Sequence, residues 1–217
     1  MKRIEQSLIA AAFVAAFLAP AAPGFAQHIE HVAQAPAAVK VAETSAALRD
    51  LWLGHVFWVR NVVVDTFAGN KAAAASAEKQ VVANARLIAD SIAPYYGKEA
   101  SEKLFGLLAA HYGAVKQYLE ANAAGSKARQ DAAVDSLTRN AAEIARFLSD
   151  ANPNLPYDTL NSLLLAHGGH HLQQIQQLHN RQYQQESETW EAMKDHMYGI
   201  ADAMAGAIAK QFPAKFV

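Results

Sequence analysis

Histidine residues near the C-terminal end of the chain have the spacing of a metal site. His167 and His171 are four residues apart, so on a helix their imidazoles lie on one face, one turn apart. His196 follows on the next amphipathic segment, and in a helical hairpin it would face this pair. Three neutral imidazoles with an open fourth position suit zinc, and imidazole also binds copper, nickel or iron. The spacing therefore predicts a transition-metal site at His167, His171 and His196.

Two methionines flank the third histidine of this set. Met193 lies three residues before His196 and Met197 directly after it, and thioether ligands would favour copper(I) over zinc. A wider set is also open, because His55 and His111 can converge in the middle of a bundle with histidines of the C-terminal part. This wider set, His55, His111, His167 and His196, could ligate one metal ion or, through two facing imidazoles, a haem. Zinc, copper and haem are therefore the cofactors that the sequence leaves open.

The histidines belong to a pattern that recurs every 56 residues without gaps. The recurring polar positions are His55, His111 and His167 in one series, and Asn84, Asn140 and His196 in the other. Apolar positions keep the same register, among them Leu48, Leu104 and Leu160; Leu51, Leu107 and Leu163; Ile88, Ile144 and Ile200. The pattern predicts a unit repeated three times.

Each unit reads as a helical hairpin. Apolar residues at spacings of three and four share a face with the repeated histidine, and a second amphipathic segment carries the repeated Asn or His196. Gly69 and Gly125 mark the turn between the two segments. At the corresponding place the third unit has Arg181, within a Gln-rich stretch that predicts extra helix or a longer loop.

No alternating strand pattern competes with these helices. We therefore expect an all-α fold, a helical bundle of three repeated αα-hairpins with about six helices around a shared interior. An open solenoid of three units is the alternative architecture.

The repeated polar residues also have a purely structural interpretation. Within a hairpin, a histidine on the first helix could donate a hydrogen bond to the Asn on the second. His55 with Asn84 and His111 with Asn140 would then be satisfied core pairs. Since a duplicated unit copies its packing, repetition by itself favours this interpretation for the first two hairpins.

The N-terminal residues have the features of a signal peptide over residues 1–26. Lys2 and Arg3 precede an apolar run, and small residues before position 27 suit cleavage. Residues 27–43 show no sustained periodicity and are expected to be a flexible segment, followed by one helical-bundle domain over 44–217. We expect an exported protein of the periplasm or the extracellular space, without a transmembrane segment after signal cleavage.

Composition restricts the chemistry further. The chain has no Cys, which excludes disulfides, thiolate metal sites and covalent c-type haem. Nineteen basic and twenty acidic side chains, without a basic block, give no electrostatic footprint for nucleic acid. A metal ion or small ligand is therefore the expected partner, and the sequence says nothing of a protein partner.

Several short strings resemble a poorly characterised family of exported bacterial all-helical proteins. The strings are His55-Val56-Phe57-Trp58, Pro94-Tyr95-Tyr96-Gly97, Ala151-Asn152-Pro153-Asn154 and Gln211-Phe212-Pro213-Ala214-Lys215-Phe216. The resemblance extends over nearly all of the expected mature chain and implies a bacterial, exported setting. It implies no established activity. Some relatives carry a glycosyltransferase label, but nothing in this chain fits a nucleotide-sugar-binding fold.

The sequence thus predicts an exported helical protein that binds a transition metal or related small ligand through inward-facing histidines, without clear catalysis. One alternative is a structural or protein-interaction module with hydrogen-bonded core histidines. Another is a metal-dependent hydrolase, although the chain has no His-Glu-x-x-His or other recognisable catalytic motif.

Overall fold

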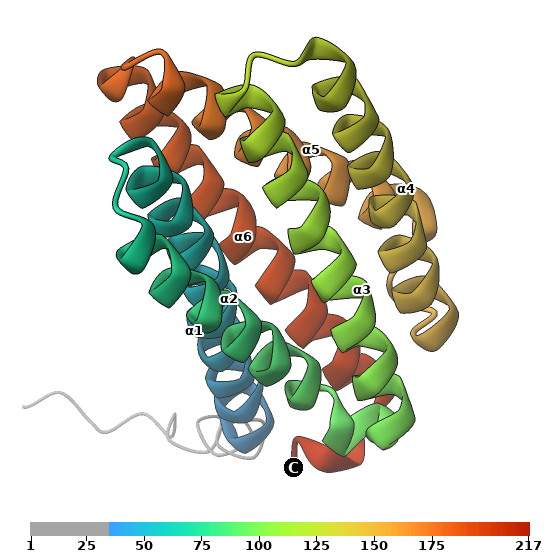
Figure 1. The fold of residues 1–217 in the computed structure, drawn as a ribbon. Coiled ribbons are helices and arrows are strands. Elements are labelled where there is room, and N and C mark those ends of the chain that lie inside the picture. The colour runs from blue at the N-terminus through green and yellow to red at the C-terminus, as the bar shows by residue number, and fades with distance from the viewer. Residues whose placement is uncertain (1–34) are drawn as a thin grey trace, which may run out of the picture. The chain divides into compact units, whose positions relative to one another are not determined.

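Six α-helices and no strand occur in residues 35–217, the part of the chain that the computed structural model describes. The helices are α1 (Ala35–Phe67), α2 (Lys71–Ser91), α3 (Ala93–Ala123), α4 (Lys127–Ala151), α5 (Tyr157–His179) and α6 (Tyr183–Gln211), and a 3₁₀ turn η1 (Pro213–Lys215) follows them. The predicted all-α bundle is confirmed (Figure 1).

The six helices form a closed ring. Each helix packs against the next along the chain, and α6 packs against α1. In addition, α1, α3 and α5 contact one another, so the first helix of each hairpin meets the other two across the interior. Closure of the ring distinguishes this bundle from the open solenoid. Side chains that α1, α3 and α5 direct inward at one level must therefore come together.

The turns inside the three hairpins have the same length and geometry. Three residues separate the helices in each case, and the middle one has a positive φ: 72° at Gly69, 65° at Gly125 and 58° at Arg181. The extra helix or longer loop predicted for the third hairpin is therefore wrong. The backbone of Arg181 adopts the left-handed conformation that glycine supplies elsewhere. These turns keep the 56-residue interval, while the internal repeat itself stays a prediction.

Two apolar clusters make up the core, one on each side of the recurring histidines. On α3, for example, Leu108 belongs to the first cluster and Val115 to the second, with His111 between them. The same holds on α1, where Trp52 and Val59 flank His55. A layer of polar side chains thus interrupts an otherwise apolar interior.

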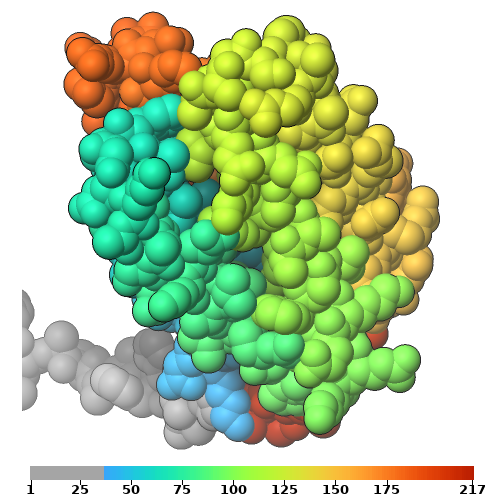
Figure 2. Space-filling view, viewed as in Figure 1, coloured from blue at the N-terminus to red at the C-terminus, as the bar shows by residue number. Residues whose placement is uncertain are grey.

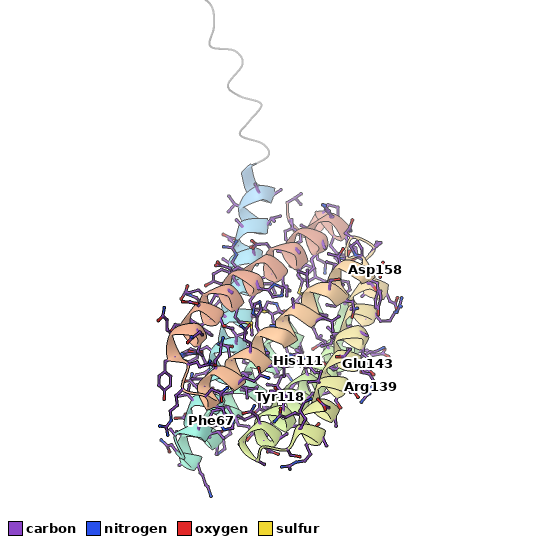
Figure 3. All side chains as sticks on the ribbon, turned by 90° about the horizontal axis from the view of Figure 1, so that it is seen from above. Phe67, His111, Tyr118, Arg139, Glu143 and Asp158 are labelled. Atoms are coloured by element: carbon purple, nitrogen blue, oxygen red, sulfur yellow. The ribbon has the colours of Figure 1, made fainter. Side chains whose placement is uncertain are left out.

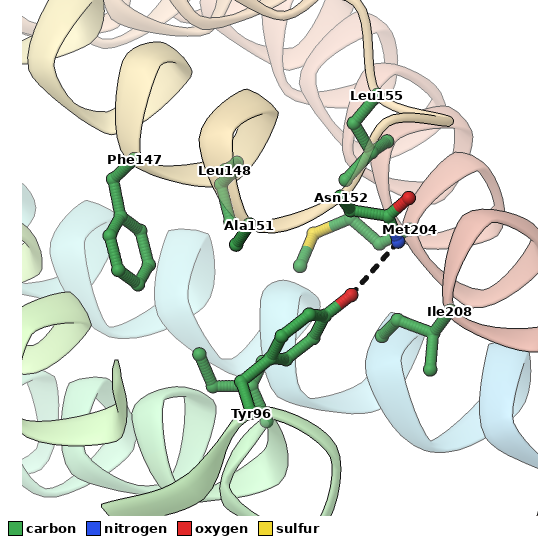
Figure 4. A pocket seen from close by; sticks show the side chains of 9 residues that line it. Tyr96, Phe147, Leu148, Ala151, Asn152, Leu155, Met204 and Ile208 are labelled. Atoms are coloured by element: carbon green, nitrogen blue, oxygen red, sulfur yellow. Dashed lines mark hydrogen bonds between the residues drawn. The ribbon is translucent and has the colours of Figure 1, made fainter. Parts of the chain in front are cut away.

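One end of the bundle is closed by a hydrogen-bonded group around Tyr96. Its hydroxyl donates to Gln211 Oε1 at 2.8 Å. The same hydroxyl accepts from Asn152 Nδ2 at 2.8 Å (Figure 4). Gln211 Nε2 donates in turn to the carbonyl of Ala151 at 2.9 Å. These bonds join the start of α3 to the end of α4 and the end of α6.

Helix α3 has a kink near its start, at the corner between the first two hairpins. Gly97, with φ 85°, lies inside α3 and redirects the helix. From this corner α2 and α3 diverge, and the surface between them is hollowed in the space-filling view (Figures 1 and 2).

The helical domain starts earlier than expected. Helix α1 begins at Ala35, although the sequence predicts a flexible segment up to residue 43. Alanines are frequent in this stretch and have the highest helix propensity, which accounts for the extension. The predicted signal peptide lies outside the described residues. None of the helices between residues 35 and 217 combines the length and apolarity needed to cross a membrane.

The turn at Arg181 gives a stability prediction. Replacing Arg181 by Gly removes the cost of a side chain in the left-handed region, so we expect the free energy of unfolding to rise by about 1 kcal/mol. Gly125→Ala, at the matching turn, should lower it by about the same amount. Chemical denaturation of both variants measures the effect. A fall in stability for Arg181→Gly would contradict the turn geometry described above.

Candidate metal centre

Four histidines from three helices meet in the middle of the bundle. They are His55 on α1, His111 on α3, and His167 and His171 on α5. Each side chain is only 2–3% exposed. Figure 3 shows His111 inside the bundle, whereas the charged residues Arg139, Glu143 and Asp158 lie at its outer side. We refer to these four residues as the histidine cluster.

The cluster has the dimensions of a tetrahedral metal site. One nitrogen from each of its four imidazoles can be chosen so that all lie within 4.8 Å of one another. At ion-to-nitrogen distances of 2.0–2.1 Å, tetrahedral ligands lie about 3.4 Å apart and their ring centroids about 5 Å apart. The six centroid separations range from 4.6 to 6.0 Å. Closing around an ion therefore requires side-chain shifts of about 1 Å, without rearrangement of the helices.

Most of the ring nitrogens in the cluster lack a partner. Among residues 35–217, the buried atoms without any hydrogen bond include both nitrogens of His55, Nε2 of His111, Nδ1 of His167 and Nε2 of His171. A buried polar atom left unpaired costs about 1 to 3 kcal/mol. All four residues of the cluster have at least one such unpaired nitrogen. Packing alone gives no reason to place four of these side chains together. A metal ion would take one lone pair from each of the four imidazoles.

His111 has the orientation of a metal ligand. Its Nδ1 donates to Asn140 Oδ1 at 3.2 Å, and Asn140 Nδ2 donates to the carbonyl of Leu107 at 3.0 Å. With the proton on Nδ1, the lone pair is on Nε2, which is buried and has no hydrogen-bond partner in the described residues. Ligating histidines commonly have such a second hydrogen bond, which fixes the tautomer and the ring orientation. The predicted pairing of His111 with Asn140 is confirmed.

The predicted pairing of His55 with Asn84 is wrong. Asn84 Nδ2 donates to the carbonyl of Leu51 at 3.0 Å, and in the described part of the chain neither Asn84 Oδ1 nor His55 has a hydrogen-bond partner. The amide packs closely against Gly54, where an added Cβ would lie 2.8 Å from Asn84 Nδ2. The matching position on α3 is Ala110. His55 is the member of the cluster of which both ring nitrogens are buried and unpaired in the described residues.

His196 does not face His167 and His171 as the sequence predicts. Its Nε2 donates to the carbonyl of Leu163 at 2.9 Å, and its ring lies beside His170 at a centroid separation of 5.5 Å. Among residues 35–217, the group of side chains that could hold an ion together contains His55 and His111 and does not contain His196. The physical reason is that the inward faces of α1, α3 and α5 meet in the centre, whereas α6 belongs to the outer part of the ring.

The two methionines proposed as supporting ligands are buried in the apolar core. Met193 and Met197 are at most 1% exposed and pack with the first cluster, which contains Trp52 and Val56. The structure thus places them as core residues.

An ion pair with a buried carboxylate contacts Gln174, which lies one turn beyond His171 on α5. Glu186, 2% exposed, accepts two hydrogen bonds of 2.6 Å from Arg60 and one of 3.0 Å from Gln174 Nε2. These bonds connect α1, α5 and α6. Because its charge is matched by Arg60, Glu186 is not free to neutralise an ion in the histidine cluster. The sequence shows both residues, but no local pattern pairs positions 126 residues apart.

Burial keeps the cluster neutral. It lowers the pKa of His55 to about 3, with a further contribution from the charge of His111, and it lowers the pKa of His111 to about 4 against the opposing hydrogen bond to Asn140. Burial, followed by the charges of neighbouring histidines, lowers the pKa of His167 and of His171 well below 6.5. All four imidazoles are therefore in the neutral form that coordinates metals.

A haem does not fit between these histidines. Their rings are 4.6 to 6.0 Å apart, centre to centre, and His111 and His167 are stacked with an interplanar angle of 17°. A macrocycle placed between two of them would have to displace the others. A single ion is the ligand that matches the space.

Comparison with known proteins gives no further assignment. No family model, curated protein or solved structure matches the chain. The family resemblance seen in the sequence therefore stays a prediction, and the site has to be interpreted from its own geometry.

The lowered pKa values predict how the metal-free protein responds to pH. The unfolded chain takes up protons on these histidines below about pH 6.5, whereas in the folded chain His55 does so only near pH 3 and His111 only near pH 4. The pKa values of His167 and His171 are likewise lowered, well below 6.5. Stability should thus be full above pH 6.5 and decline as the pH falls, by up to roughly 1 kcal/mol per pH unit for each buried histidine.

Urea denaturation of the metal-free protein at pH 7.5, 6.5 and 5.5 measures this dependence. A free energy of unfolding that stays constant over this range would show that the four imidazoles are not buried in neutral form.

Proposed function

We propose that the protein binds one transition-metal ion at His55, His111, His167 and His171. The observation that carries the proposal is the convergence of four neutral, buried imidazoles whose ring nitrogens lack other partners in the described residues. Imidazole is a ligand for zinc, copper, nickel and iron, and a fourfold imidazole set can complete a tetrahedral shell.

The ligand set favours holding an ion over reacting with a substrate. Catalytic zinc sites keep a coordination position open for water or substrate, whereas sites with four protein ligands are closed. No carboxylate belongs to the candidate group among residues 35–217, so a general base for hydrolysis is not provided there. We therefore favour metal storage, carriage or a structural metal over a metal-dependent hydrolase.

Zinc and copper(I) are the two ions that the site suits. Zinc adopts tetrahedral geometry with nitrogen ligands. Four neutral ligands, however, leave the whole charge of the ion in an apolar interior, and the cost of burying charge rises with its square. This second consideration favours the monovalent ion. Together with the signal-like N-terminal residues, the site is consistent with metal handling outside the cytoplasm, and export forms part of the proposal.

The structural alternative has one supporting observation, the hydrogen bond from His111 to Asn140. Under this alternative the histidines would stabilise the fold in the absence of metal. It leaves His55 unexplained, since both nitrogens of this buried residue lack partners in the described structure.

Replacing His55 by Leu separates the two interpretations. If the site binds metal, the variant loses tight binding of Zn²⁺ or Cu⁺. Its metal-free form should nevertheless unfold with a free energy higher by about 1 to 3 kcal/mol, because an unpaired polar side chain becomes an apolar one. Affinity is measured by competition with a chelator, and stability by denaturation in the presence of that chelator.

His179→Ala is the control, since His179 lies at the end of α5 and bonds to Asn122. It should bind metal as the wild type does. A wild-type protein without tight metal binding, together with a metal-free His55→Leu variant that is less stable than wild type, would support the structural alternative.

Two asparagines provide a matched test of ligand orientation. Asn140 and Asn84 both donate to a backbone carbonyl, but only Asn140 contacts a histidine of the cluster. Asn140→Ala should therefore weaken metal binding about 10- to 100-fold, whereas Asn84→Ala should lower stability and leave the affinity near that of wild type. Equal losses of affinity in the two variants would contradict this role of Asn140.

A further inference from the structure

A second pair of histidines lies between α5 and α6, beside the histidine cluster but separate from it. The rings of His170 and His196 have a centroid separation of 5.5 Å and an interplanar angle of 61°. Both side chains are partly exposed, in contrast to the cluster. His170 directly precedes His171 in the chain, and His196 is near enough to His167 for its charge to contribute to the lowered pKa of that residue.

The geometry of this pair suits joint coordination of an ion. Two imidazoles bound to one metal at tetrahedral angles have ring centroids about 5 Å apart. His196 Nε2 is occupied by its hydrogen bond to the Leu163 carbonyl, so the proton lies on Nε2 and the lone pair lies on Nδ1. The pair therefore offers two imidazole ligands, and water can fill the remaining positions of an ion at the surface.

The bond to Leu163 does not by itself require a histidine. In the other two hairpins Asn84 and Asn140 make the matching bonds, to the carbonyls of Leu51 and Leu107. An asparagine amide thus suffices to hold the second helix against the first, and His196 adds a ring nitrogen that an asparagine lacks. The position of His170 is likewise occupied by Trp58 and Ala114 in the other hairpins. His170 and His196 thus both belong to the third hairpin, which also supplies two of the four histidines of the cluster.

We propose that His170 and His196 form a second, weaker metal site, from which an ion passes into the histidine cluster. This inference rests on the proposed function. A hydrated ion cannot meet four ligands that are 2–3% exposed without first losing water, and a pair of partly exposed imidazoles can replace two waters at the surface. The ion then moves inward by exchanging one neutral imidazole ligand for another, since His171 is next to His170 and His167 is near His196. No proton or electron is transferred in this exchange.

His196→Asn tests the proposal with little disturbance of the fold, because Asn84 and Asn140 show that an asparagine can make the carbonyl bond. Wild-type protein titrated with Zn²⁺ should bind one equivalent tightly and a second more weakly. The variant should lose the weaker equivalent and keep the affinity of the tight one. In the variant, Zn²⁺ should enter the tight site more slowly than in the wild type, on the order of tenfold. Stopped-flow with a zinc-responsive dye measures this rate.

His170→Gln should behave like His196→Asn. The control is His179→Gln, at the end of α5, which should behave like the wild type. An unchanged loading rate in both His196→Asn and His170→Gln would overturn this inference and leave the proposed function intact. Absence of the tight equivalent from the wild-type protein would overturn the proposed function, and that result is obtained before any variant is made.

Discussion

Four imidazoles buried in the core without enough hydrogen-bond partners are the constraint around which the rest of this structure is arranged. In residues 35–217, five of their ring nitrogens are buried and unpaired, and each costs about 1 to 3 kcal/mol. The net stability of a domain is only about 5 to 15 kcal/mol. The apolar clusters on either side of this layer must therefore offset a considerable cost in the metal-free protein. Metal binding would convert most of that cost into coordination, because one nitrogen of each imidazole would bind the ion. Stability of the fold is thereby linked to occupation of the site.

The closed ring of helices explains how one site can draw ligands from distant parts of the chain. Since α1, α3 and α5 contact one another, each hairpin directs one helix face to the same interior level. Asn84, Asn140 and His196 hold the second helix of each hairpin against the carbonyl group of a leucine on the first. This arrangement fixes the histidines through backbone contacts on rigid elements, and only small side-chain shifts remain for closure around an ion.

The helices and their pairing could be predicted from the sequence because apolar spacing and turn residues are local signals. The turn at Arg181 could not, since the chain adopts there a backbone conformation that its residue type disfavours.

For the site, the 56-residue interval of His55, His111 and His167 points to the correct helices, and the spacing of four adds His171. The position of His196 depends on which helix faces the centre, and this is a property of the assembled ring. The same is true of the ion pair between Arg60 and Glu186.

X-ray absorption spectroscopy of the protein loaded with one equivalent of zinc tests the central claim most directly, because it reports the type, number and distance of the ligands. The account predicts a shell of four nitrogens at about 2.0 to 2.1 Å with the scattering pattern of imidazole. A shell dominated by oxygen, or fewer than three imidazoles around the ion, would contradict a metal centre formed by His55, His111, His167 and His171.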